Sequence, residues 1–137
     1  MTARISDRAA MIRGMTPKLR PGTWHFCTLP DGHPGGGALR AAAVATIREV
    51  EGLSLILATD VADRAGLSSD QPMAMISLAV HSALDGVGLT AAVAGALAER
   101  GIACNMVAGH HHDHAFVPAA DADRSIACLR ALAEAGA

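Results

Sequence analysis

The sequence predicts an α+β fold built from two fused units, each with an antiparallel sheet and helices on one face. Two observations lead to this prediction. Runs with the two-residue period of strands alternate with runs of helical period in both halves, and the second half has the order strand, helix, strand, strand, helix. The chain also has only 137 residues, and two independent domains of half that length would each be marginally stable.

In the first half, residue patterns predict two short helices and three strands. The helices are expected at residues 6–14, with Ser6 as the cap, and at residues 61–65, with Asp60 as the cap. The strands are expected at residues 23–29, 42–50 and 53–59, and Glu51 and Gly52 form the turn between the last two.

A glycine-rich segment, DGHPGGG at residues 31–37, separates the first of these strands from the second. Glycine adopts positive φ angles at little cost, so this composition predicts a mobile loop. A P-loop would end in Gly-Lys-Ser or Gly-Lys-Thr, whereas Ala38, Leu39 and Arg40 follow here. We therefore interpret the segment as a linker.

In the second half, strands are expected at residues 73–81, 102–108 and 114–117, and helices at residues 89–100 and from about residue 121. The first helix places Leu89, Val93 and Leu97 on one stripe, which should face the sheet. This order is that of a ferredoxin-like unit without its last strand, which the first half could supply. We place the two units at residues 1–70 and 71–137.

The composition excludes several classes of partner. Eleven basic and thirteen acidic residues are spread along the chain and give a net charge of −2, so we expect no nucleic-acid-binding surface. No apolar run is long enough to span a membrane, and we expect no membrane partner. The three cysteines, Cys27, Cys104 and Cys128, form no C-x-x-C pair, which favours a reducing, cytoplasmic location over a disulfide framework.

A glycine turn at residues 86–88 lies between the strand and the helix of the second half. It superficially matches the dinucleotide-binding pattern, but the next strand turns directly back, which a nucleotide-binding fold does not allow. Two interpretations remain: a tightly packed turn, or free N–H groups near Gly88 and Leu89 that receive a ligand carboxylate. His81 and Asn105, at neighbouring strand positions, could serve either structure or ligand contact.

The densest polar cluster is the run His110, His111, His112, Asp113 and His114. In an extended segment the first, third and fifth of these side chains would share one face and could hold Zn²⁺, Ni²⁺ or Cu²⁺. The alternatives are a hydrogen-bonded hairpin and ligand contact through the last three residues. A metal protein or hydrolase that uses His110, His112 and His114 is thus the competing function.

We predict no catalytic residue, no resident metal and no cofactor. Cys104 lies in an apolar strand, where a thiol packs as a small hydrophobic group. Ser77 has no nucleophile-elbow context.

Several motifs carry a resemblance to a known family. They are EGLSL at residues 51–55, VHSAL at 80–84, VGLTAAV at 87–93, GIACNMVAG at 101–109 and HDHAFVP at 112–118. The second half, residues 75–132, resembles an ACT domain, and the whole chain resembles bacterial proteins with tandem ACT-like units.

The resemblance implies a βαββαβ fold that binds amino acids or similar effectors, often across a dimer interface. In such domains the ligand lies at the turn from the first strand to the first helix, which Asp85 and Gly88-Leu89 match. Val87 stands where the family usually has proline, and Asn105 matches the strand that closes the site. We therefore predict a non-enzymatic, homodimeric regulatory module for an amino-acid-like effector. The expected ligand-binding residues are His81, Asp85, Gly86, Val87, Gly88, Leu89, Asn105, His112 and Asp113.

Overall fold

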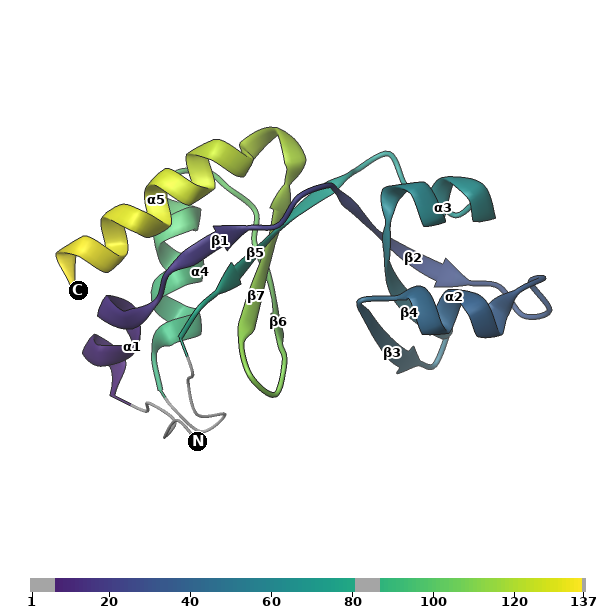
Figure 1. Cartoon of the computed structure of the whole chain (residues 1–137), viewed down its shortest axis with the longest axis horizontal. Helices are drawn as coiled ribbons and strands as arrows, with labels where there is room; N and C mark the ends of the chain where they lie inside the picture. The colour runs from purple at the N-terminus through teal and green to yellow at the C-terminus, as the bar shows by residue number, and fades with distance from the viewer. Residues whose placement is uncertain (1–6, 81–86, 137) are drawn as a thin grey trace. The chain divides into compact units, whose positions relative to one another are not determined.

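The structure is a computed structural model that describes residues 7–80 and 87–136 of the chain. It contains two compact units that are interleaved along the sequence (Figure 1). The split unit comprises the described residues of Met1–Arg20 and Ala74–Ala137, and the inserted unit comprises Pro21–Met73. The boundary at residue 70 that the sequence indicates separates two repeats that follow each other along the chain. That boundary stays a prediction.

The inserted unit has the order strand, helix, strand, strand, helix. Its elements are β2 (Trp24–Leu29), α2 (Gly36–Ala42), β3 (Ala45–Glu49), β4 (Gly52–Ala58) and α3 (Thr59–Ala65). The strands form an antiparallel sheet in the order β3-β4-β2. Side chains alternate between the two faces along each strand, and one face of this sheet is apolar. It forms a core with Leu39 of α2 through Cys27 and Leu29 of β2 and Leu55 and Leu57 of β4.

The split unit has the same order of elements, preceded by an N-terminal helix and strand. Its elements are α1 (Arg8–Gly14), β1 (Pro17–Leu19), β5 (Met73–Leu78), α4 (Leu89–Glu99), β6 (Asn105–Ala108), β7 (Asp113–Pro118), the 3₁₀ turn η1 (Ala119–Asp121) and α5 (Ala122–Ala135). Helices α1, α4 and α5 contact one another and cover the sheet with an aliphatic core. Leu89, Val93 and Leu97 of α4 are buried in it, which confirms the predicted stripe.

Strand β1 completes the sheet of the split unit, whose order is β1-β5-β7-β6. It pairs antiparallel with β5, with Pro17 opposite Leu78 and Leu19 opposite Ile76. Proline is tolerated there because β1 is an edge strand and can leave one side of its backbone unpaired. The strand missing from the second half is thus supplied by the first half, and the predicted α+β, ferredoxin-like fold with two fused units is confirmed.

The largest error in the predicted elements is helix α2. The segment 31–37 was expected to be a loop throughout, but the helix begins at Gly36 and runs to Ala42. Leu39 is its only buried residue in a sequence with two glycines, so helical periodicity is too weak to detect in seven residues. The burial of Leu39 against β4 stabilises a helix that local propensity would not form.

Smaller errors concern caps and strand ends. Asp60 does not cap α3 but lies in its first turn, after Ala58. The β3–β4 turn is Val50–Glu51, because Glu49 pairs with Gly52. Ser6 lies outside the described residues, and the side chain of Asp7 caps α1. The predicted strand 102–108 begins only at Asn105.

Candidate functional site

The predicted ligand turn of the split unit is described from Val87 onward, while His81, Asp85 and Gly86 lie outside the described residues. Gly88 has φ 110° and immediately precedes α4, and no side chain of the described residues caps this helix. The side chain of Leu89 is buried, so only its backbone can face a ligand, whereas Val87 is 79% exposed. The first-turn N–H groups of α4 are therefore without a side-chain partner from the described chain, as an anion site requires.

Arg8 of α1 covers this turn. A Cβ atom on Gly88 would lie 2.5 Å from Cδ and 2.8 Å from Cγ of Arg8, so only glycine leaves room for this side chain. Nε of Arg8 lies 3.0 Å from the same point, which brings the base of the guanidinium group to the start of α4. A helix N-terminus carries partial positive charge, and a nearby arginine adds to it. Both features attract a negatively charged group.

The hairpin between β6 and β7 contributes the histidines. The N–H of Gly109 donates to the carbonyl oxygen of His112 at 2.8 Å and closes the turn. Nδ1 of His112 lies 3.4 Å from the carbonyl oxygen of Val80, and Nδ1 of His114 lies 2.8 Å from Oγ of Ser77. These contacts hold the hairpin against the end of β5.

The electrostatic surroundings of His114 favour its neutral form. Burial of the ring is the largest cause that lowers its pKa, followed by the positive charges of His112 and Arg20, while Asp113 acts in the opposite direction. A neutral imidazole has one donor and one acceptor nitrogen. Nδ1 can therefore either donate a hydrogen bond to the hydroxyl of Ser77 or accept one from it.

The predicted site residues are only partly brought together within one chain. The end of β5, the start of α4 and the β6–β7 hairpin lie at the same end of the split unit (Figure 1), so Gly88 and Leu89 share that end with His112 and Asp113. Asn105 pairs with Phe116, whereas Ala108 at the other end of β6 pairs with Asp113. At about 3.3 Å per residue, Asn105 lies roughly 10 Å further along the strand from the hairpin.

The metal alternative finds no support in the part of the chain that the structure describes. No group of three or more His, Cys, Asp or Glu side chains there could hold a metal ion. His110 and His111 contact each other edge to face, with ring centroids 4.9 Å apart, and do not share an extended face with His114. Burial raises the pKa of the thiols of Cys27 and Cys104, which keeps both protonated and weakly nucleophilic.

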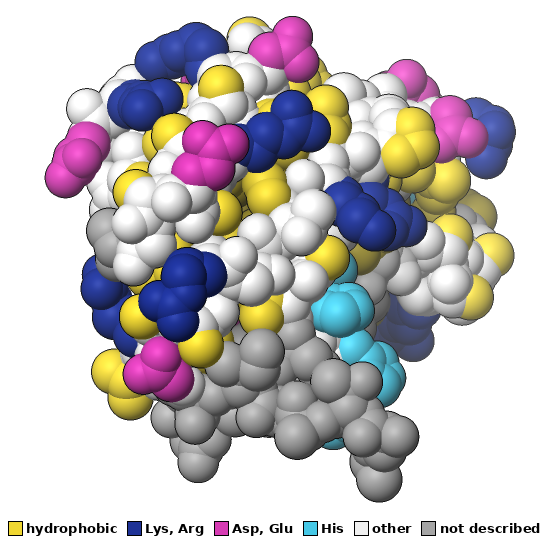
Figure 2. Space-filling view, turned by 60° about the vertical axis from the view of Figure 1, so that its left-hand side comes forward, with side chains coloured by type: hydrophobic (Ala, Val, Ile, Leu, Met, Phe, Trp, Pro, Cys, Tyr) yellow, Lys and Arg dark blue, Asp and Glu magenta, His cyan; other side chains and the backbone are white. Residues whose placement is uncertain are grey.

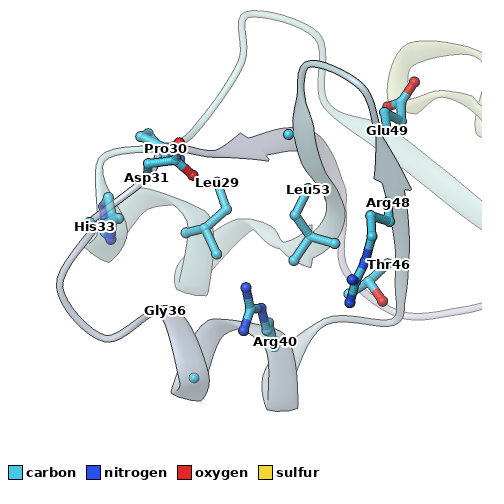
Figure 3. Close-up of a pocket in the computed structure, with 13 residues that line it drawn as sticks. Leu29, Pro30, Asp31, His33, Gly36, Arg40, Thr46, Arg48, Glu49 and Leu53 are labelled. Carbon is cyan, nitrogen blue, oxygen red and sulfur yellow. The ribbon is translucent and has the colours of Figure 1, made fainter.

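The inserted unit contains an open cleft that the sequence did not predict, with a volume of about 540 Å³ (Figure 3). It lies between the β2–α2 loop, helix α2 and the β3–β4 hairpin. The lining residues are Leu29, Pro30, Asp31, Gly32, His33, Gly36, Gly37, Arg40, Thr46, Arg48, Glu49, Gly52 and Leu53. The signal that could have indicated it was the alternation that places Thr46 and Arg48 on one face of β3, close in sequence to Arg40.

The loop at this cleft contains His33, whose ring contacts two backbone oxygens. Nδ1 of His33 lies 2.8 Å from the carbonyl oxygen of Pro34, and Nε2 lies 3.1 Å from the carbonyl oxygen of Ala65 in α3. Which of the two nitrogens donates depends on the tautomer, and the contact with Ala65 joins the loop to α3. The predicted loop is confirmed for residues 31–35, which form a wall of the cleft, whereas residues 36 and 37 belong to α2. The mobility of the loop stays a prediction.

Two interleaved units of the βαββα order, each with a β–α turn and a β-hairpin, define the class of protein as a tandem of ferredoxin-like units. Two ACT domain models match, one at residues 5–74 and the other at residues 68–131. The chain belongs to the ACT domain family, which confirms the resemblance seen in its motifs. Membership of this family makes the chain a ligand-binding regulatory module in the broad sense.

Solved structures of similar proteins support the same fold. A Vibrio cholerae protein of unknown function, described as a possible transport protein, is 40% identical, with a TM-score of 0.79 over 91% of this chain and 94% of that chain. An Agrobacterium tumefaciens protein is 21% identical, with a TM-score of 0.66 over 87% and 89% of the two chains. The ligand-free regulatory subunit of aspartate kinase from Thermus thermophilus is 16% identical, with a TM-score of 0.65 over 87% and 97%. No curated protein matches the chain.

The surface carries charged side chains of both signs. On the face seen in Figure 2, Lys and Arg side chains are interspersed with acidic and apolar ones, and they form no continuous basic stripe. No helix within residues 7–80 and 87–136 has the length and apolar character needed to cross a bilayer.

Proposed function

We propose that the chain is a non-enzymatic regulatory module that binds an amino-acid-like effector at the start of α4. The observation that carries this proposal is the junction at Gly88, where α4 begins without a side-chain cap from the described residues and with Arg8 alongside. Family membership supports the proposal, because ACT domains typically bind small effectors. A protein that shares the fold is described as the regulatory subunit of aspartate kinase, which agrees with a regulatory role.

The chemistry of the junction suggests how an amino acid would be held. Its carboxylate would accept hydrogen bonds from the first N–H groups of α4, supported by the positive charge of Arg8. Asp85, which lies outside the described residues, is the proposed partner of the ammonium group. His112 and Asp113 of the hairpin are placed at the same end of the unit and would contact the effector's side chain.

The position of Asn105 is a reason to propose a homodimer. Within one chain Asn105 is at the far end of β6 from the hairpin, although it is exposed and on an edge strand. A second copy that presents its edge strand could bring this amide to the site, and ACT domains often dimerise. The effector would then shift the equilibrium between assembly states by its differential affinity for them. We place this regulator in the cytoplasm, without a nucleic-acid or membrane partner.

Isothermal titration calorimetry of the full chain against single amino acids tests this function. We expect at least one amino acid to bind, with affinity reduced about tenfold or more by Asp85→Ala and by Arg8→Met, because each variant removes one charge partner. Asp60→Ala, which alters an exposed acid on α3, is the matched control and should bind normally. Absence of binding by all amino acids at millimolar concentration, or equal affinities in all variants, would contradict the proposal.

A further inference from the structure

We propose that the cleft of the inserted unit is a second ligand site, specific for a small organic anion with a carboxylate or phosphate monoester group, and that Arg40 and Arg48 bind that group. The cleft is formed wholly by residues of Pro21–Met73. The proposal therefore does not rest on the effector site at α4, and either can fail without the other.

The two arginines approach the cleft from facing walls. Arg40 extends from α2 and Arg48 from β3, and Figure 3 shows both side chains directed into the space between these elements, with Thr46 beside Arg48. Neither guanidinium group has an ion pair or a side-chain hydrogen bond within the described residues. Guanidinium groups bind carboxylates and phosphates through paired N–H donors, so two of them across one cleft suit a single anionic group.

The acidic residues of the cleft are separated from its arginines. Figure 3 shows the carboxylates of Asp31 and Glu49 away from the guanidinium groups, and Glu49 directed out of the cleft. Glu49 accepts a hydrogen bond from the hydroxyl of Ser54, and this contact does not involve the two arginines. These rim carboxylates would repel an extended polyanion while they leave the arginines available to a compact one. The charge arrangement therefore favours a small anion over a nucleic acid.

The remaining surface of the cleft limits the size and polarity of the ligand. Leu29 and Leu53 point into the cleft between its polar walls (Figure 3) and offer an apolar surface to a short hydrocarbon body. The volume of about 540 Å³ lies within the range of small-molecule sites, which is roughly 300–1,000 Å³. A small carboxylic acid or a phosphate ester of a small alcohol would satisfy both the arginines and the leucines.

The corresponding place in the split unit differs in charge. There the start of α4 and a hairpin of histidines lie at the same end of the unit, and burial lowers the pKa of His114, whereas the inserted unit presents permanently charged arginines. The two repeats thus share the order of their elements but offer different chemistry. We infer that they do not bind the same ligand.

Calorimetry of the full chain at constant ionic strength tests the site with two sets of probes. Inorganic phosphate and glycerol phosphate represent the phosphate class, and acetate and succinate represent the carboxylate class. We expect one class to bind at millimolar concentration or better, and that class identifies the ligand chemistry. Arg40→Gln and Arg48→Gln should each weaken binding about tenfold or more, since each removes a charge-assisted contact.

Arg64→Gln is the matched control, because Arg64 is an exposed arginine on α3 of the same unit, paired with Asp60 across one helical turn. It should bind the probe with unchanged affinity. Circular dichroism should show intact folding for all three variants, since all three arginines are exposed. The proposal is overturned if neither class binds, if Arg40→Gln and Arg48→Gln bind normally, or if Arg64→Gln weakens binding as much as they do.

Discussion

Replacement of Gly88 by alanine should destabilise the split unit more than any other glycine substitution in α4 or at its start. The residue has φ 110°, which lies in the region that side chains other than glycine rarely occupy. Backbone strain of this kind costs about 1–3 kcal/mol. The added Cβ would also lie 2.5 Å from Cδ of Arg8, and displacement of that side chain from its rotamer costs about 0.5–1.5 kcal/mol.

Urea unfolding followed by circular dichroism measures this cost, which we expect to total about 2–4 kcal/mol. Gly95→Ala is the matched control, because Gly95 lies inside α4 and a Cβ there would meet no atom within 4 Å. That variant should be more stable than the parent by about 0.5–1 kcal/mol, as expected for alanine in a helix.

The same experiment in an Arg8→Ala background separates the two sources of the cost. Without the arginine side chain, Gly88→Ala should lose only the backbone term, so the coupling between the two positions should be about 0.5–1.5 kcal/mol. The reasoning is refuted if Gly88→Ala is as stable as Gly95→Ala. If Gly88→Ala costs the same free energy of unfolding in the parent and in the Arg8→Ala background, only the contact with Arg8 is refuted.

Three further predictions concern stability. Leu97→Ala removes a fully buried side chain from the core of the split unit and should cost about 2–5 kcal/mol in urea unfolding, an expectation that a loss below about 1 kcal/mol would contradict. Asp7→Ala removes the acceptor that lies 2.9 Å from the N–H of Ala10 and should lower the free energy of unfolding by about 0.5–2 kcal/mol, whereas Asp7→Asn should restore much of it. Because the folded-state pKa of His114 is lowered, its contribution to stability is present above the unfolded pKa of 6.5 and is lost as the pH falls below it. Unfolding of the parent between pH 7.5 and 5 should therefore show a loss of stability that is smaller in His114→Gln.

Local patterns predicted the elements whose stabilising contacts are close in sequence. The stripe of Leu89, Val93 and Leu97 was visible because a helical face repeats every three or four residues. The six buried residues of β5 were likewise visible as an apolar run. Strand β1 was not visible, because three residues that include Pro17 carry too little strand signal, and it exists only through its pairing with β5.

The candidate sites were predictable to different degrees. The turn at Gly88 was found because a glycine followed by an amphipathic helix is a local signal of a helix start. The position of Asn105 relative to that turn depends on the register of β6 with β7, which no short-range pattern specifies. The arginine cleft was missed because Arg40 belongs to a helix that burial of Leu39 stabilises, while Arg48 belongs to a strand.

By itself, the sequence determined the kind of fold, the family and the order of the strands and helices other than α2 and β1, since these follow from periodicity and motifs that each span a few residues. Only the tertiary structure decided that the two units are interleaved, because the partner of β1 lies more than 50 residues away along the chain. It also decided which charges converge, since Arg40 and Arg48 face one cleft only after α2 has packed on the sheet of the inserted unit. Contacts between segments distant in sequence leave no local period, and they are the contacts that build both candidate sites.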